Sequence, residues 1–150
     1  MGKKYYIPSL EEFHVGFEFE YRDEHYEGRE LFQRAKIESD CVLRLIDDKS
    51  EDNYCEYDHF LSNIKYDIEH GDIRVKYLDK EDIENFGFKE SHFSNINNAF
   101  YKKDFYTLNQ NNCKIIISFN DNGNNIVLFN GIIKNKSELK RLLTQLQIIK

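Results

Sequence analysis

The chain has 150 residues, of which 40% are hydrophobic and 15% aromatic, with one proline and no tryptophan. This composition excludes a disordered chain, and the length is sufficient for a domain with its own core. The net charge is −6, with 20 acidic and 12 basic side chains in residues 1–80 against 7 and 9 in residues 81–150. Because nucleic acid is bound largely by neutralising phosphates, direct nucleic-acid binding is not expected, and a basic protein is the better partner for the acidic half.

The cysteines and the N-terminus indicate the compartment. Cys41, Cys55 and Cys113 cannot all pair within the chain, so we predict free thiols in a reducing environment, with that of Cys113 buried at the start of a strand. The N-terminus lacks the apolar segment of a signal peptide, and no apolar run has the length of a membrane span. We expect a cytoplasmic protein without cofactors, folded as one globular domain over residues 1–150.

Residues 1–78 contain strand patterns and one helix pattern. The best alternating segment is 14–22, in which Val15, Phe17, Phe19 and Tyr21 would share the buried face. The other segments are a returning strand over 30–37, an apolar segment over 40–47 that fits a strand or a helix, a helix over 57–68 that ends at Gly71, and a strand over 73–78.

Residues 79–150 begin with a short helix over 80–86, which Asp79 would cap and Gly87 would end. A strand over 100–108 follows. Residues 114–119 and 126–133 are two apolar runs on either side of Asn122-Gly123, the sequence of a tight hairpin turn. That turn would place Phe119 opposite Ile126, and Ile117 opposite Leu128.

Both faces of this hairpin carry apolar side chains, so we expect it at the centre of a sheet. After it, Ser137 would cap a final helix whose apolar face is formed by Leu139, Leu142, Leu143 and Leu146. The pattern as a whole predicts an α+β fold. It would have a mostly antiparallel sheet of about five to seven strands, two or three helices, and a C-terminal hairpin followed by an amphipathic helix.

Two groups of residues have the composition of a metal site. His14, Glu18 and Glu20 would lie on one face of a strand, where they could bind a divalent metal or act as acid and base. The alternative is the charged solvent face of an amphipathic strand. Cys55 and His59 have the spacing of half a zinc site, but the sequence offers no second pair of ligands.

The candidate partner-binding site is an acidic stretch with interleaved tyrosines. Such a stretch could dock on a basic groove, with the tyrosine rings as anchors. The alternative is a solvated charged loop. The predicted residues are Glu38, Asp40, Asp47, Asp48, Glu51, Asp52, Tyr54, Glu56, Tyr57 and Asp58.

Three segments resemble a set of small uncharacterised proteins of Bacteroidetes bacteria and of their phages and mobile elements. They are IPSLEEFHVGFEFEY at 7–21, IRVKYLDKEDIENFGF at 73–88 and LFNGIIKNKSELKRLL at 128–143. The resemblance covers about half the chain and implies no activity or catalytic residue. If the chain is encoded by a phage or mobile element, as the resemblance suggests, it would act in the host cytoplasm.

These observations lead to three hypotheses. The first is a non-enzymatic protein that binds a basic host protein, such as an RNA-guided nuclease, and inhibits a nucleic-acid-targeting defence system in the manner of an anti-CRISPR protein. The second is a divalent-metal-dependent enzyme that uses His14, Glu18 and Glu20. The third is a structural accessory protein that associates with itself through the edges of its sheets.

Overall fold

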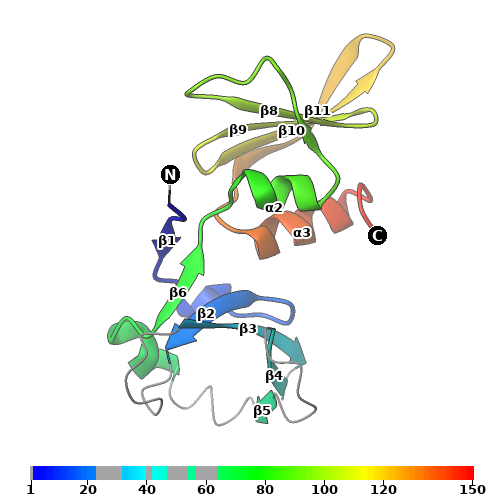
Figure 1. Ribbon diagram of the computed structural model, residues 1–150. Helices are drawn as coiled ribbons and strands as arrows, with labels where there is room; N and C mark the ends of the chain where they lie inside the picture. Colours follow the sequence, from blue (N-terminus) through cyan, green and yellow to red (C-terminus); the bar gives the residue numbers. More distant parts are fainter. Residues whose placement is uncertain (1, 23–31, 40–41, 47–53, 57–63) are drawn as a thin grey trace. The chain divides into compact units, whose positions relative to one another are not determined.

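The computed structural model describes residues 2–22, 32–39, 42–46, 54–56 and 64–150. The chain divides into two compact units, Met1–Lys76 and Tyr77–Lys150, which are described separately below (Figure 1). Each unit has an antiparallel sheet and helical segments, which confirms the α+β class. The described residues form eleven strands in two sheets, more than the number expected for one sheet. The single domain over residues 1–150 stays a prediction.

In the first unit, the described strands form a six-stranded sheet in the order β1-β6-β2-β3-β4-β5. A one-turn helix, η1 (Leu10–Glu12), precedes β2, and a helix over residues 64–69 precedes β6. The core of this unit contains Phe17, Phe19, Ala35, Ile37, Leu43, Ile64, Ile73 and Val75. The strands are β1 (Tyr5–Tyr6), β2 (Glu18–Arg22), β3 (Phe32–Ser39), β4 (Val42–Leu45), β5 (Tyr54–Glu56) and β6 (Ile73–Lys76).

The alternating segment at 14–22 forms a shorter strand than predicted. Gly16 has a φ of 90°, which L side chains rarely adopt, and its N–H donates to the carbonyl of Ile37 at 2.7 Å. Because of this turn, the strand begins only at Glu18. Phe17 and Phe19 are buried as predicted, whereas Val15 lies in the turn and is 51% exposed.

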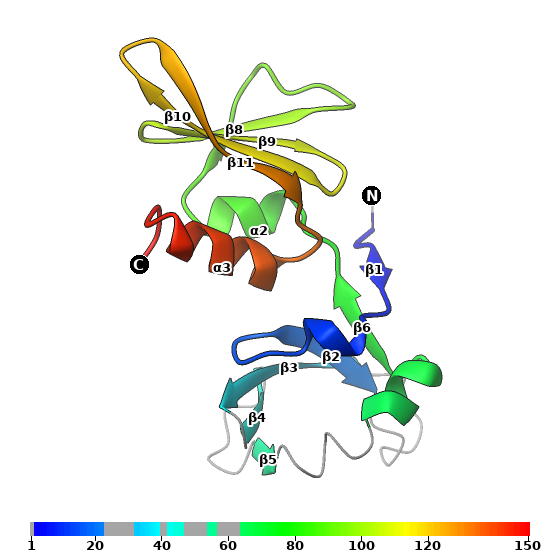
Figure 2. The same cartoon turned by 180° about the vertical axis from the view of Figure 1, so that it is seen from behind.

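In the second unit, every residue of which is described, a five-stranded sheet has the order β11-β10-β9-β8-β7. The strands are β7 (Lys89–Glu90), β8 (Ala99–Lys103), β9 (Tyr106–Asn111), β10 (Lys114–Asp121) and β11 (Asn124–Ile132). The helices α2 (Lys80–Asn85) and α3 (Lys136–Gln145) lie on one face of this sheet (Figures 1 and 2).

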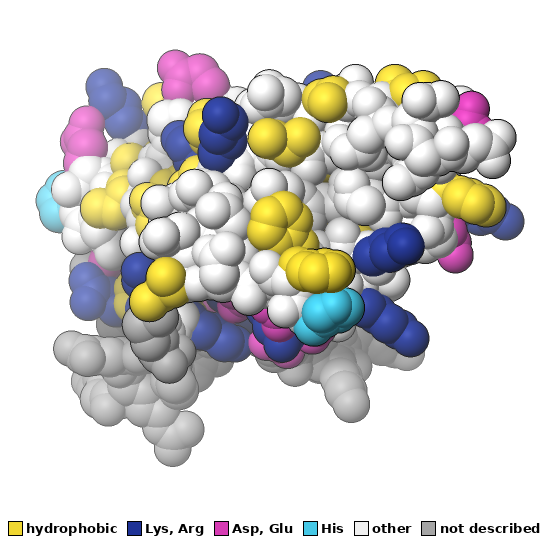
Figure 3. Space-filling model, turned by 90° about the horizontal axis from the view of Figure 1, so that it is seen from above, with side chains coloured by type: hydrophobic (Ala, Val, Ile, Leu, Met, Phe, Trp, Pro, Cys, Tyr) yellow, Lys and Arg dark blue, Asp and Glu magenta, His cyan; other side chains and the backbone are white. Residues whose placement is uncertain are grey.

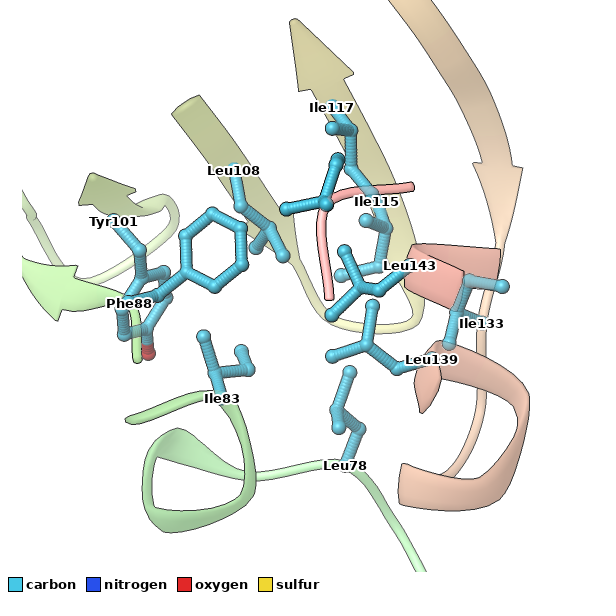
Figure 4. Packing of buried hydrophobic residues seen from close by; sticks show 11 residues of the cluster. Leu78, Ile83, Phe88, Tyr101, Leu108, Ile115, Ile117, Ile133, Leu139 and Leu143 are labelled. Atoms are coloured by element: carbon cyan, nitrogen blue, oxygen red, sulfur yellow. The ribbon is translucent and has the colours of Figure 1, made fainter. Parts of the chain in front are cut away.

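A hydrophobic cluster fills the space between this sheet and its helices (Figure 4). Leu139 and Leu143 of α3 are fully buried, which confirms the predicted apolar face of the last helix. They pack with Leu108 of β9 and with Ile115 and Ile117 of β10, while Leu142 and Leu146 are partly buried at the margin.

Asp79 caps α2 as predicted, because its carboxylate accepts from the N–H of Asp82 at 3.0 Å. The predicted cap of α3 is wrong: Asn135, not Ser137, precedes the helix. The Asn135 side-chain oxygen accepts from the N–H of Glu138 at 2.9 Å, and the backbone of Asn135 is extended. Asn is as good a cap as Ser, so the helix begins two residues earlier than Ser137 would allow.

The predicted strand over 100–108 is a hairpin. Lys103 pairs with Tyr106, and Asp104 between them has a φ of 50°. The next connection repeats this geometry: Asn112 has a φ of 52°, and the half-buried Cys113 lies in the turn and not, as predicted, in the strand. Asp and Asn tolerate this left-handed conformation better than most residues, which makes these short turns possible without glycine.

The β10–β11 hairpin turns at Asn122-Gly123 as predicted, and Phe119 pairs with Ile126. A bulge then shifts the register, so that Ile117 pairs with Phe129 and not with the predicted Leu128. The predicted central position holds for β10 alone. β11 pairs with β10 on one side and forms the edge of the sheet.

Candidate binding surfaces

The structure describes part of the predicted acidic site. Glu38 is exposed on β3, and its carboxylate accepts from the Arg44 guanidinium at 2.6 Å. Tyr54 and Glu56 belong to β5, whose backbone pairs with β4. The rest of the predicted site, Asp40, Asp47, Asp48, Glu51, Asp52, Tyr57 and Asp58, lies outside the described residues.

The three candidate metal ligands of the first unit have other contacts. The Nδ1 atom of His14 lies 2.8 Å from the carbonyl oxygen of Glu12. Glu20 forms an ion pair of 2.6 Å with Arg74, and Glu18 stands opposite Lys36 in the sheet. Among the described residues, no group of three or more His, Cys, Asp or Glu side chains is arranged to hold a metal ion. His59 and the Cys55 side chain lie outside the described part of the chain.

Arg74 organises this part of the sheet. Its guanidinium lies 3.8 Å from the centre of the Tyr5 ring and 3.8 Å from that of Phe32, while its Nε donates to Glu20. A guanidinium between two aromatic rings gains cation–π attraction from both, and the Glu20 carboxylate adds a charge-assisted hydrogen bond. Glu20 is therefore engaged as a structural partner of Arg74, an arrangement that competes with metal binding.

A second arginine holds the buried carboxylate of this unit. The Arg22 guanidinium donates to Asp72 at 2.6 and 3.0 Å, and the Asp72 side chain is 5% exposed. Burial of an unpaired carboxylate costs free energy, and the ion pair with Arg22 offsets this cost for Asp72. Sequence reasoning missed both arginine partners, because pairs separated by 50 or 54 residues have no local pattern.

The second unit has an open sheet face opposite its helices. Side chains alternate along each strand, so the neighbours of the buried Tyr101, Leu108, Ile115 and Ile117 point outward. These neighbours and their cross-strand partners include three lysines and no carboxylate. In this fully described unit they are Lys89, Phe100, Lys102, Thr107, Asn109, Asn111, Lys114, Ile116, Ser118, Asn120, Asn125, Val127, Asn130 and Ile132.

Figure 3 shows this region as a mostly uncharged surface with scattered hydrophobic side chains and lysine or arginine toward its margins. An open hollow of about 550 Å³ lies on it. Phe93 and Phe100 contribute rings, Ile116 and Val127 contribute aliphatic surface, and side-chain amides supply donors and acceptors. Lys102 is the cationic side chain of the lining, so this hollow favours neutral or anionic groups.

Beside the hollow, β11 exposes an unusual amount of apolar surface for a single strand. Ile126, Val127, Leu128 and Ile132 are between 38% and 61% exposed. Sequence reasoning missed this edge because it placed the whole hairpin inside the sheet. The sequence of the strand, NNIVLFNGI, contains no charge and gave no signal of an edge position.

Three groups of the second unit, Lys80, Glu90 and Tyr101, have shifted pKa values. The hydrogen bond and charge of Lys80, 2.6 Å away, lower the pKa of Glu90, and the same contacts raise the pKa of Lys80. Burial raises the pKa of Tyr101 to about 12, helped by the negative charges of Glu90, Glu84 and Asp79. Tyr101 is therefore neutral wherever the protein is folded near neutral pH.

The chain matches no protein-family model, no curated protein and no solved structure. Within the described residues, no helix has the length and apolar character needed to cross a membrane.

Proposed function

We propose that this protein is a non-enzymatic binding protein whose acidic first unit docks on a basic protein. The observation that carries the proposal is the separation of charge between the two compact units. Residues 1–76 hold 19 acidic and 11 basic side chains, whereas residues 77–150 hold 8 and 10. Such segregation generates a field that speeds association with a surface of opposite sign and disfavours wrong partners.

The ion pairs of the first unit sharpen this assignment. Glu20, Glu38 and Asp72 each have an arginine partner in the described structure, so their charges are locally compensated. The uncompensated excess must come from the other acidic residues of this unit. Seven of them belong to the predicted site: Asp40, Asp47, Asp48, Glu51, Asp52, Glu56 and Asp58.

The partner that fits this chemistry is a host protein with a groove built for nucleic acid. Such grooves are lined by lysine and arginine to neutralise phosphates, and an acidic protein surface can occupy them in place of the nucleic acid. The resemblance to proteins of phages and mobile elements favours a partner from a defence system, such as an RNA-guided nuclease. The protein would then act in the host cytoplasm as an inhibitor of the anti-CRISPR type.

The test is comparative capture from a Bacteroidetes lysate, followed by affinity measurement with the purified partner. The bait is either the natural chain or a variant with Asp47, Asp48, Glu51 and Asp52 changed to Lys. A matched control changes four exposed carboxylates elsewhere, Glu11, Glu69, Glu81 and Asp121, to Lys, so that the net charge is identical.

We expect the natural chain and the control variant to capture the same basic protein, and the acidic-site variant to lose it. The purified partner should bind nucleic acid less well when this protein is present. Equal capture by both variants contradicts the assignment of the site, because net charge alone would then explain the binding. Capture of acidic or neutral partners only would contradict the proposed function itself.

A further inference from the structure

The edge strands of the two sheets differ greatly in length. Among the described strands, β1 and β7 have two residues each and β5 has three, whereas β11 has nine. An edge strand presents unpaired backbone N–H and C=O groups to any other strand that approaches. Proteins commonly protect such edges by keeping them short, or by placing charges or proline on them.

β11 lacks these protections. Its sequence, NNIVLFNGI, contains no charged residue and no proline. The β10–β11 hairpin also extends beyond the neighbouring strands of its sheet, so part of β11 stands clear of them (Figures 1 and 2). An edge of this length, with four exposed aliphatic side chains, is suited to pairing with another strand.

We propose that β11 pairs with β11 of a second copy of this chain, so that two five-stranded sheets join into one antiparallel sheet. The absence of charge favours a second copy over an unrelated strand. Self-pairing brings identical residues close together, which is costly for a charged strand and free of repulsion for this one. β11 has no charge with which it could select one foreign strand over another.

The bulge in β11 limits the register of this pairing. The register shift opposite Ile117 and Ser118 leaves Leu128 as the extra residue, between the regular segments 124–127 and 129–132. Val127 lies on the open face and Phe129 packs against the helix-side core, so the bulge reverses the alternation of faces.

Equivalent faces therefore meet when segment 124–127 pairs with itself: a two-fold axis at Ile126 places Ile126 beside its symmetry mate and Val127 opposite Asn125 of the second copy. Since antiparallel neighbours are related by an axis perpendicular to the sheet, the helices of both copies lie on the same face of the joined sheet.

The test is the molar mass of the full chain in solution, from low micromolar to submillimolar concentration, by light scattering and sedimentation. The variant is Val127→Lys, which puts a charge near its symmetry mate at the proposed axis. The matched control is Ile96→Lys, at an apolar residue of the loop between β7 and β8 that is 99% exposed. We expect a dimer for the natural chain and for the control, and a monomer for Val127→Lys.

A natural chain that stays monomeric throughout this range overturns the proposal, as does a dimer that persists in folded Val127→Lys. If Val127→Lys does not fold, amide hydrogen exchange of the natural chain decides the matter. Slower exchange of β11 at higher protein concentration supports the pairing, and concentration-independent exchange of β11 overturns it. None of these outcomes depends on the acidic unit, so the proposed function and this inference can fail separately.

Discussion

Replacement of Arg74 by Ala should destabilise the first unit by about 1–3 kcal/mol. The Arg74 guanidinium contacts two aromatic rings, Tyr5 and Phe32, each worth about 0.5–1 kcal/mol at a partly exposed site. Its ion pair with Glu20 adds about 1 kcal/mol at most, because the Arg74 and Glu20 side chains are 33% and 17% exposed and solvent screens their charges. The rings, rather than the carboxylate, therefore account for most of the expected loss.

Two further variants separate these contributions. Glu20→Gln removes only the charge partner and should cost about 1 kcal/mol or less. Arg74→Lys keeps the charge but lacks the planar guanidinium, so it should fall between Glu20→Gln and Arg74→Ala. The assay is urea unfolding followed by far-ultraviolet circular dichroism, because the chain has no tryptophan to serve as a fluorescent probe.

A loss below about 0.5 kcal/mol for Arg74→Ala, the range of an ordinary surface substitution, would refute the reasoning about the ring contacts. Metal titration of the natural chain and of Arg74→Ala provides a second readout. If His14, Glu18 and Glu20 form no metal site, neither protein should bind manganese or zinc, even when Glu20 has lost its arginine partner. Tight binding that appears only in Arg74→Ala would revive the metal hypothesis.

Four other predictions concern the second unit. Leu143→Ala should cost about 2–5 kcal/mol in urea unfolding, since Leu143 is fully buried between α3 and the sheet, whereas exposed Ile96→Ala should be nearly neutral. Asn135→Ala should cost about 1 kcal/mol through loss of the helix cap, and Asn135→Asp should restore most of it. Gly123→Ala should cost about 1–2 kcal/mol because Gly123 has a φ of 87°; equal stability would contradict the turn geometry. Burial raises the pKa of Tyr101 to about 12, above its unfolded value, so the stability that the neutral phenol contributes is complete below pH 10. Between pH 10 and 12 the free energy of unfolding should fall by about 1.4 kcal/mol per pH unit. Tyr101→Phe should remove this part of the alkaline loss, and an unchanged pH profile in that variant would contradict the prediction.

Local signals were sufficient for much of the fold. The apolar face of α3, the cap at Asp79 and the Asn122-Gly123 turn follow from residues within one helical turn or one hairpin loop, and all three are confirmed. The sequence failed where two local solutions competed. Asn135 and Ser137 are both good caps, and the choice depends on how the chain leaves β11.

Long-range features were beyond local reasoning. The edge position of β11 depends on which strand pairs with β10 on each side, and nothing within NNIVLFNGI specifies that. The pairing of Arg74 with Glu20 and of Arg22 with Asp72 likewise depends on the neighbouring positions of β2 and β6. Through these ion pairs, Glu20 and Arg22 on the charged face of β2 have partners within the sheet, where the sequence suggested a metal site.

The salt dependence of binding to the captured basic protein tests the central claim most directly. If the acidic residues of the first unit form the interface, the logarithm of the dissociation constant should rise steeply with the logarithm of the salt concentration for the natural chain. The slope should become shallow when Asp47, Asp48, Glu51 and Asp52 are changed to the neutral Asn and Gln, and remain steep when the four carboxylates of the matched control are neutralised in the same way. A dissociation constant that does not respond to salt, or slopes that are equal in the two variants, would contradict the account.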